Sequence, residues 1–305
     1  MRVFVTGASG HIGSAVVPEL LAAGHVVVGL ARSDESAAGL VAVGADVHRG
    51  DLDDLAGLQQ AAGAADGVIH LAFKHDAMRA NDFAGAVAAD LRAVETIGTA
   101  LHGSGKPFVV TSGTLMLTFA GITGRPGTEQ DVLAGGPRID AENTAIALAA
   151  HGVRSSVVRL PPLVHSSLDR HGFGPTLIDI ARSTGVSGYV GEGTNRWPAV
   201  HTLDAAHLFR LALESAPAGT RLHAVGDDGV PMRDIATVIG RHLNVPVTAI
   251  ATDDTAEHFG FLAPFVSLDN PTSSKQTREL LDWRPTHPTL IDDLGAGHYF
   301  DNPTA

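Results

Sequence analysis

The stretch MRVFVTGASGHIGSA, residues 1–15, decides the fold of this chain. Three apolar residues that favour strands, Val3 to Val5, are followed at once by a segment with glycines at 7, 10 and 13. Apolar residues then recur at helical spacing from Ile12 to Leu21. The stretch therefore predicts a strand, a glycine-rich turn and a helix, in that order.

The three glycines meet three separate steric needs of a turn that holds a diphosphate. Gly7 allows the tight turn, Gly10 lets the backbone approach the ligand, and Gly13 lets helix and strand pack closely. The free N–H groups at the start of the helix then face the negative charge of the diphosphate. We expect the contacts along this turn to come from Thr6, Gly7, Ser9, Gly10, His11, Ile12 and Gly13.

Composition and charge exclude several classes of protein. The chain has 305 residues, of which 44% are hydrophobic and 18% are charged, as in an ordinary globular protein. The formal net charge of −12 argues against nucleic acid or an anionic membrane as the main partner. Cysteine is absent, so disulfides and thiolate metal sites are excluded. No signal-peptide or membrane-helix pattern stands out, and we expect a cytoplasmic protein with a small-molecule substrate.

Short apolar runs alternate with helical patterns over the first 160 residues. Because parallel strands need helical crossovers, this alternation predicts an α/β fold with a Rossmann-type doubly wound parallel sheet. Further strands are expected at 26–31, 45–48, 67–71, 107–111, 153–160 and 221–225, and helices at 33–43, 52–62, 82–101, 139–150 and 203–214.

The alternation ends at two prolines, Pro161 and Pro162. Residues 172–200 are rich in glycine, and we expect only short elements there. We predict that residues 1–165 form the cofactor-binding domain and that 201–226 return to it. Residues 166–200 and 227–305 should then form a smaller substrate-binding region that closes over the far end of the cofactor.

The end of the second strand favours NADP over NAD. An acidic residue at this place binds the ribose hydroxyls of NAD, whereas arginine pairs with the 2′-phosphate of NADP. Arg32 and Ser33 stand there, and no carboxylate precedes Asp34. The alternative is that Arg32 is simply a solvated loop residue. Further cofactor contacts are expected from Asp51 and Leu52 at the adenine and from Leu71, Ala72 and Phe73 beneath the diphosphate and ribose.

Six motifs along the chain point to one family. They are TGASGHIG at 6–13, GDL at 50–52, HLA at 70–72, TSGT at 111–114, VHTLDAAHL at 200–208 and SSKQTRELLDWRP at 273–285. With these motifs the chain resembles the short-chain dehydrogenase/reductase superfamily, in its extended and atypical branch of NAD-dependent epimerase/dehydratase-like proteins. The resemblance implies a nicotinamide cofactor, and a homodimer formed through the helices at 82–101 and 139–150.

The chain departs from this superfamily at its usual catalytic pair, a tyrosine acid/base followed four residues later by a lysine. Neither Tyr189 nor Tyr299 has a lysine at that spacing. By position, Arg138 and Glu142 occupy the tyrosine and lysine places. The resemblance therefore implies the fold and the cofactor but not the chemistry.

Other residues are candidates for the missing catalytic groups. Ser112 and Thr114 end the fifth strand, where either hydroxyl could bind a carbonyl or could bond only to backbone. Asp90 is either the organiser of a water chain or a solvated helix carboxylate. His165 and His201 are candidate proton donors, although most histidines in a chain with 16 of them have no such role.

Residues expected at the substrate end are Lys74, His75, Met116, Arg196 and Trp197. The last two either recognise an anionic or planar substrate or pin their own loop. No metal site is expected, since His201 and His207 do not share a helix face and no H-E-x-x-H motif occurs.

Three functions remain open on these grounds. The first is an NADP-dependent oxidoreductase of the carbonyl reductase or alcohol dehydrogenase type with a non-standard proton donor. The second is a non-catalytic NADP-binding redox sensor or partner-binding module. The third is a nucleotide-sugar epimerase or dehydratase, which would still need a strong base.

Overall fold

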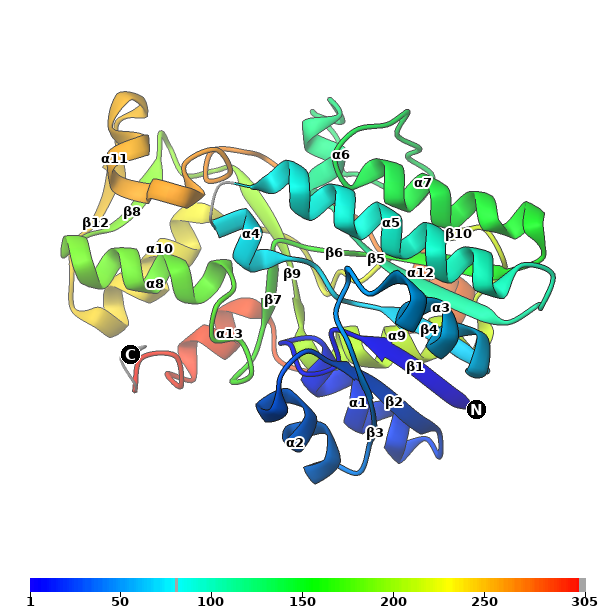
Figure 1. Cartoon of the computed structure of the whole chain (residues 1–305). Helices are drawn as coiled ribbons and strands as arrows, with labels where there is room; N and C mark the ends of the chain where they lie inside the picture. Colours follow the sequence, from blue (N-terminus) through cyan, green and yellow to red (C-terminus); the bar gives the residue numbers. More distant parts are fainter. Residues whose placement is uncertain (80–81, 302–305) are drawn as a thin grey trace.

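The structure is a computed structural model that describes residues 1–79 and 82–301. Its centre is a seven-stranded sheet with the order β10-β6-β5-β4-β1-β2-β3, in which every neighbouring pair is parallel (Figure 1). This confirms the α/β Rossmann-type fold. The strands are β1 (Arg2–Thr6), β2 (Val26–Ala31), β3 (Asp46–Arg49), β4 (Gly67–His70), β5 (Pro107–Gly113), β6 (Arg154–Leu160) and β10 (Thr220–His223).

The strand order reverses between β1 and β4, which pair with Thr6 opposite His70. In open sheets of this kind ligands bind outside the carboxyl ends of the strands at such a reversal. The glycine turn follows β1 directly and therefore lies at this place.

Two helical layers cover the sheet (Figure 1). Residues of α1, α2 and α9 pack with one face of the sheet, and residues of α3, α5 and α7 pack with the other. The bounds of these helices are α1 (Gly13–Ala22), α2 (Asp34–Ala42), α9 (Thr202–Ser215), α3 (Leu55–Ala64), α5 (Phe83–Leu101) and α7 (Ile139–Ala147).

Most expected elements are present with shifted ends, and caps explain the shifts. The helix expected at 52–62 begins later, because the Asp54 side chain accepts a hydrogen bond from the Gly57 N–H and caps it. Asp82 likewise caps α5 and lies outside it. Helix α7 ends at Ala147 and continues as a 3₁₀ turn, η1 (Leu148–His151).

The C-terminal part has its own core, built around Trp197 and Met232. It contains a small sheet of β7, β9 and β11 and a two-stranded sheet of β8 and β12. The expectation of only short elements at 172–200 is wrong, because α8 is a 12-residue helix. The elements of this part are β7 (Leu163–His165), α8 (Phe173–Thr184), β8 (Ser187–Val190), β9 (Arg196–His201), β11 (Asp227–Pro231), α10 (Met232–Leu243), β12 (Val247–Ile250), η2 (Thr252–Asp254), α11 (Thr255–Phe259), η3 (Gly260–Leu262) and α13 (Leu290–Gly295). Helix α12 (Lys275–Leu281) instead packs against α9 and β10 of the main sheet.

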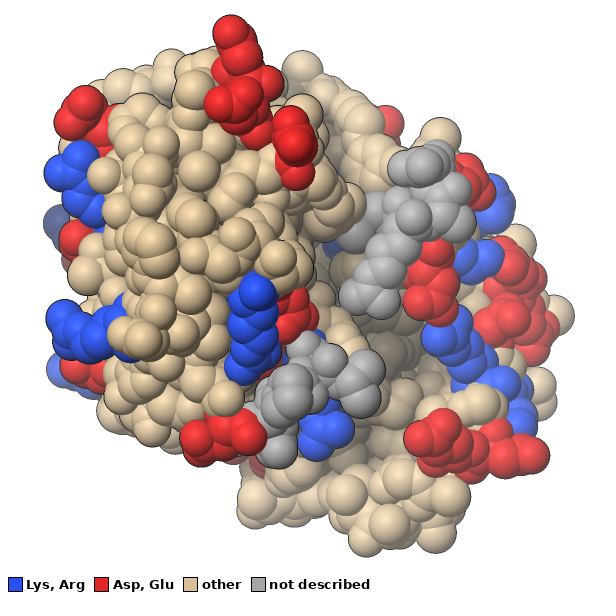
Figure 2. Space-filling model, turned by 90° about the vertical axis from the view of Figure 1, so that its left-hand side faces the viewer, with Lys and Arg blue, Asp and Glu red and all other residues tan. Residues whose placement is uncertain are grey.

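The predicted division of the chain stays a prediction, although 201–226 does supply α9 and β10 to the main sheet and its layer. Two short helices, α4 (His75–Arg79) and α6 (Leu115–Phe119), follow the ends of β4 and β5. Seen from the side of α8 and α10, the surface is hollowed between two lobes, with charged side chains of both signs around the hollow (Figure 2). Within 1–79 and 82–301, no helix is long and apolar enough to cross a membrane.

Candidate functional site

The glycine turn is packed so tightly that two of its glycines cannot carry a side chain. Gly7 has a φ of +67°, and a Cβ there would lie 2.7 Å from the Ala72 nitrogen. A Cβ on Gly13 would lie 2.2 Å from the Gly7 oxygen. Both clashes are with backbone and cannot be relieved by a side-chain rotation. The backbone of β1, α1 and the segment after β4 therefore meets at this turn.

The Thr6 side chain belongs to the interior rather than to the cofactor surface. It is fully buried, its Oγ1 lies 2.8 Å from His70 Nδ1, and it accepts a hydrogen bond from the Ala72 N–H. His70 Nε2 in turn lies 3.2 Å from Asp90 Oδ1. The predicted contact of Thr6 with the cofactor would therefore have to come from its backbone, and it stays a prediction.

Asp90 is 1% exposed, so the alternative of a solvated carboxylate is wrong. Its role as an organiser of a water chain stays a prediction: Oδ1 lies beside His70, and Oδ2 is buried without a partner among the described residues. The pair joins α5 to β4 inside the protein.

Arg32 lies at the end of β2, as expected, and is exposed. Its guanidinium forms an ion pair of 2.9 Å with Asp76. Ser33 caps α2 through a hydrogen bond from the Ser36 N–H. Arg49, which the sequence analysis did not single out, pairs with Asp34 and donates to the Ser33 carbonyl. Two arginines therefore flank Ser33, where a 2′-phosphate would be recognised.

The residues expected near the adenine and the substrate are divided between surface and interior. Asp51 accepts hydrogen bonds from the Asp53 and Asp54 N–H groups and shapes the turn after β3, while Leu52 is buried in the core. Lys74 forms an ion pair with Asp53. The segment Leu71, Ala72 and Phe73 is half-buried, and the Phe73 ring lies 5.3 Å from that of His75.

The two hydroxyls at the end of β5 have different surroundings. Thr114 is fully buried and donates to Asn270 Oδ1 at 2.9 Å, so it ties β5 to the C-terminal part and is not available to a carbonyl. The Ser112 hydroxyl helps to lower the pKa of Glu142, yet it makes no hydrogen bond of normal geometry to the residues described. Met116 is half-buried in α6. Ser112 is therefore the hydroxyl that remains for a ligand.

Arg138 precedes α7 in a left-handed conformation, with a φ of 63°. Its guanidinium lies over the Phe73 ring at 4.1 Å and donates to the Thr111 carbonyl at 3.3 Å. Its Nε is buried and has no partner in the described part of the chain. The side chain thus bridges the ends of β4 and β5.

Glu142, one turn further on, is a buried anion. Arg159 Nε donates to it at 3.0 Å, Arg159 Nη2 at 2.5 Å and Arg221 Nε at 2.7 Å. Burial alone would raise the pKa of this carboxyl, but the hydrogen bonds and charges of the two arginines hold the pKa below its usual value. Glu142 is therefore ionised, and both of its carboxylate oxygens accept hydrogen bonds from arginines.

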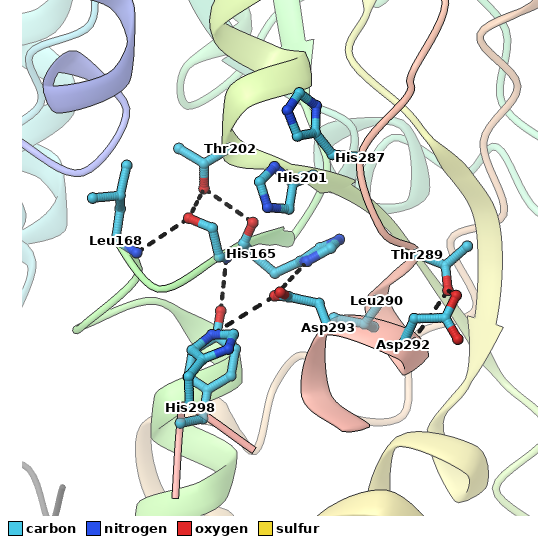
Figure 3. Close-up of polar contacts among 12 residues, drawn as sticks. His165, Leu168, His201, Thr202, His287, Thr289, Leu290, Asp292, Asp293 and His298 are labelled. Atoms are coloured by element: carbon cyan, nitrogen blue, oxygen red, sulfur yellow. Dashed lines mark hydrogen bonds and ion pairs between the residues drawn. The ribbon is translucent and has the colours of Figure 1, made fainter. Parts of the chain in front are cut away.

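His165 lies in the C-terminal part against α13 (Figure 3). Its Nδ1 is 2.9 Å from Asp293 Oδ2, and its Nε2 is buried without a partner among the described residues. Its ring lies edge-on to His201 at 5.5 Å. Burial, and then the neighbouring His165, lower the pKa of His201. A carboxylate thus orients His165 and leaves its second nitrogen unused.

His11 of the glycine turn reaches this histidine cluster. Its Nε2 is 2.9 Å from Thr202 Oγ1, and its Nδ1 is 3.6 Å from Asp169. Burial and the nearby His165 lower the pKa of His11 to about 4. Burial raises the pKa of Asp169 to about 7. The His11 side chain is thus turned toward the C-terminal part.

One group of potential metal ligands lies nearby: His201, Asp204 and His287, whose ligand atoms are within 4.8 Å of one another. The two imidazoles are stacked at 4.7 Å and 8°, so their in-plane lone pairs run side by side instead of converging on one ion. Asp204 already accepts from the backbone N–H groups of Thr286 and His287. This group is better suited to fixing the chain before α13 than to binding a metal.

The two substrate contacts expected at 196 and 197 are not supported. Trp197 is fully buried in the C-terminal core, because alternate residues of β9 face inward. Arg196 pairs side-on with Asp269, which pins its strand to the segment before residue 270. Arg196 therefore fits the second role considered for it, in which it holds its own loop in place.

The sequence reasoning also missed Arg159, Asn270 and Asp293. Asp293 is 128 residues from His165, and Asn270 is 156 residues from Thr114. No local pattern marks such pairs.

Comparison with known proteins identifies the family. The family described as "NAD dependent epimerase/dehydratase family" matches residues 3–135. An uncharacterised protein of Schizosaccharomyces pombe is 47% identical over 98% of this chain and 100% of its own length. A 4-hydroxy-2-methyl-3-oxo-4-farnesyl-3,4-dihydroquinoline-1-oxide ketoreductase of Stigmatella aurantiaca is 28% identical, over 78% of this chain and 72% of its own.

Among solved structures, DesIV, a dTDP-glucose 4,6-dehydratase of Streptomyces venezuelae with NAD and TYD bound, has the same fold. Its TM-score is 0.77 at 20% identity, covering 98% of this chain and 96% of that one. The glycine turn, the strand order and these matches agree, and the chain belongs to the NAD-dependent epimerase/dehydratase family.

Proposed function

We propose that this protein is an NADPH-dependent reductase of small carbonyl compounds. The observation that carries the proposal is the pair Arg138 and Glu142 at the start of α7. An arginine stays protonated at any physiological pH, and Glu142 is an anion neutralised by two arginines. Neither group can accept a proton from an alcohol. In a carbonyl reduction the developing alkoxide needs a hydrogen-bond donor and a proton, so both must come from residues other than this pair.

The cofactor would be held by the glycine turn and by the end of β2. Bound there, NADPH supplies the hydride. Membership of the family and the NAD in the DesIV structure support a nicotinamide dinucleotide. Arg32 and Arg49 beside Ser33 support the choice of the phosphorylated form, because a 2′-phosphate would find two guanidinium groups there.

Two groups of the chain are assigned to the substrate. The Ser112 hydroxyl, which faces Glu142 without a hydrogen bond of normal geometry, binds the carbonyl oxygen at the end of β5. His165 as the imidazolium gives its Nε2 proton to the alkoxide and takes a replacement from solvent, while Asp293 holds its Nδ1 proton and stabilises the cation.

A steady-state assay with NADPH and NADH on a broad panel of ketones and aldehydes tests the proposal. Ser112→Ala should lower kcat/KM about 100-fold, since it removes a donor to the oxyanion. Ser156→Ala is the matched control, because Ser156 is also a buried hydroxyl without a partner but lies within β6. His165→Gln should lower kcat by at least about 100-fold, and the exposed His102→Gln should not. Cofactor binding without turnover of any compound would refute the proposal.

A second candidate is nucleotide-sugar chemistry, which the similarity to DesIV over nearly the whole chain favours. It predicts that dTDP-glucose or UDP-glucose is converted in the presence of NAD. Product analysis by mass spectrometry and NMR distinguishes a dehydrated or epimerised sugar from the unchanged one.

A further inference from the structure

Arg138 has a backbone conformation that its place in the fold does not explain. Three described residues other than glycine have a positive φ: Arg138, Asn244 and Asp282. Asn244 and Asp282 follow the last turns of α10 and α12, where left-handed residues commonly end helices. Arg138 instead precedes the first turn of α7. A long side chain in this conformation costs stability, and such strain gathers at functional sites.

The guanidinium of Arg138 is held in place, but most of its N–H donors have no acceptor among the described residues. Phe73 covers one face of it at 4.1 Å. Of the five N–H donors that an arginine carries, one finds an acceptor, the Thr111 carbonyl at 3.3 Å, and Nε is buried with none in the described residues. An aromatic face and one backbone carbonyl fix the plane of the group without neutralising it.

The carboxylates nearest to it in sequence are committed elsewhere. Asp140 accepts a hydrogen bond from the Gly136 N–H. Glu142 is bound to Arg159 and Arg221. In the ranges that the structure describes, no carboxylate lies within 4 Å of the Arg138 guanidinium. Arg138 therefore has no direct ion-pair partner among the described residues, at the edge formed by the ends of β4 and β5.

We propose that Arg138 is a substrate-binding residue that pairs with a carboxylate of the substrate, and that the natural substrates are oxo acids. This inference rests on the proposed function and names its substrate class. A planar guanidinium with free donors binds a carboxylate through parallel hydrogen bonds, and an uncharged ketone would leave the cation unpaired. Specificity thus comes from the residue before α7, whose guanidinium reaches the end of β5, where Ser112 lies.

The test compares oxo acids with their methyl esters: pyruvate, acetoacetate and levulinate, which place the carboxylate at increasing distance from the ketone. At least one acid should exceed its ester by about 10- to 100-fold in kcat/KM. Arg138→Gln should abolish that preference, because the acid loses an ion pair that the ester does not make, so kcat/KM falls further for the acid than for the ester. Arg125→Gln is the matched control, because Arg125 is exposed and pairs with Asp131. Equal use of acid and ester, or an unchanged ratio in Arg138→Gln, would overturn the inference.

A binding measurement separates this inference from the proposed function. The protein saturated with NADPH is titrated calorimetrically with the same acids and esters, in wild type and in Arg138→Gln. Binding of an acid that is lost in Arg138→Gln, without turnover, supports the role of Arg138 and refutes the reductase. Turnover of uncharged ketones without any binding of carboxylates refutes the role of Arg138 and leaves the reductase standing.

Discussion

Replacing Glu142 with glutamine should destabilise the fold by about 3–5 kcal/mol. The Glu142 and Arg159 side chains have no exposed surface, and three N–H groups of Arg159 and Arg221 donate to the carboxylate. Glutamine keeps the shape but removes the charge, and it replaces one acceptor oxygen with a donor that faces other donors. The guanidinium of Arg159 is then buried without its anion, which is the costly half of a buried ion pair.

Urea unfolding of the folded protein measures this loss. The control is Glu279→Gln, since Glu279 is exposed and lies 3.9 Å from Lys275, a pair worth less than about 1 kcal/mol. The double variant Glu142→Leu with Arg159→Met should recover most of the loss, because it removes the two charges without exposed surface and leaves Arg221 bonded to Asn143. A loss below about 1 kcal/mol in Glu142→Gln would refute this reasoning, because it would show that the negative charge of Glu142 contributes little to stability. A double variant as unstable as the single one would show the same.

The pH dependence of stability provides an independent test of the negative charge on Glu142. The pKa of Glu142 is lower in the folded chain than in the unfolded chain. Its contribution is therefore present at neutral pH and is lost as the pH falls through the ordinary carboxyl range. Wild type and Glu142→Gln should differ most at pH 7 and converge in acid. A difference that grows in acid would refute the assignment of the charge.

Three further predictions concern the cofactor turn and its surroundings. Gly13→Ala should abolish NADPH binding and destabilise the protein, because its Cβ would lie 2.2 Å from the Gly7 oxygen. Gly63→Ala in α3 is the control: this position has open space around it, and the change should stabilise the protein by up to about 1 kcal/mol. Fluorescence titration measures NADPH binding and urea unfolding measures stability for both variants. Arg32→Ala should weaken NADPH binding at least about 10-fold and leave NADH binding unchanged, and an equal loss for both cofactors would contradict the NADP assignment. The pKa of Asp169 is raised to about 7 in the folded protein, so its contribution to stability is present below the ordinary carboxyl pKa and is lost as the pH rises through 7. Asp169→Asn should therefore be more stable than wild type at pH 8 but not at pH 4, and equal stabilities at pH 8 would contradict the raised pKa.

The fold could be predicted from sequence because its signals are local. The glycine turn needs only 15 consecutive residues, and strand Val26–Ala31 has the expected bounds. Helix α8 was missed because Gly174 and Pro175 look like turn residues, although proline is well tolerated in the first turn of a helix. A local pattern gives the period of an element but does not say what covers each of its faces.

That limit decides which site residues were placed correctly. Asp90 and Trp197 have polar or aromatic side chains that suit a ligand, yet packing turns both into the interior. Thr114 is no longer a candidate, because its hydroxyl donates to Asn270, a residue 156 positions away. Ser112 and His165 each retain a buried polar atom without a hydrogen-bond partner in the described chain, as Asp90 Oδ2 and Trp197 Nε1 also do. What distinguishes them is the place of Ser112 at the end of β5 and the carboxylate of Asp293 on His165 Nδ1.

The charges at the start of α7 explain why an anion is the ligand expected there. The first N–H groups of a helix carry partial positive charge, so acidic residues usually stabilise this end and a cation opposes it. Arg138 precedes that end. Of the two acidic residues in the first turn, Glu142 is already neutralised by Arg159 and Arg221, and Asp140 accepts a hydrogen bond from the Gly136 N–H. The strained backbone, the unused donors and the helix end then all favour the same missing partner. A carboxylate beside Phe73 and Thr111 would offset each of these costs at once, which a neutral substrate would not.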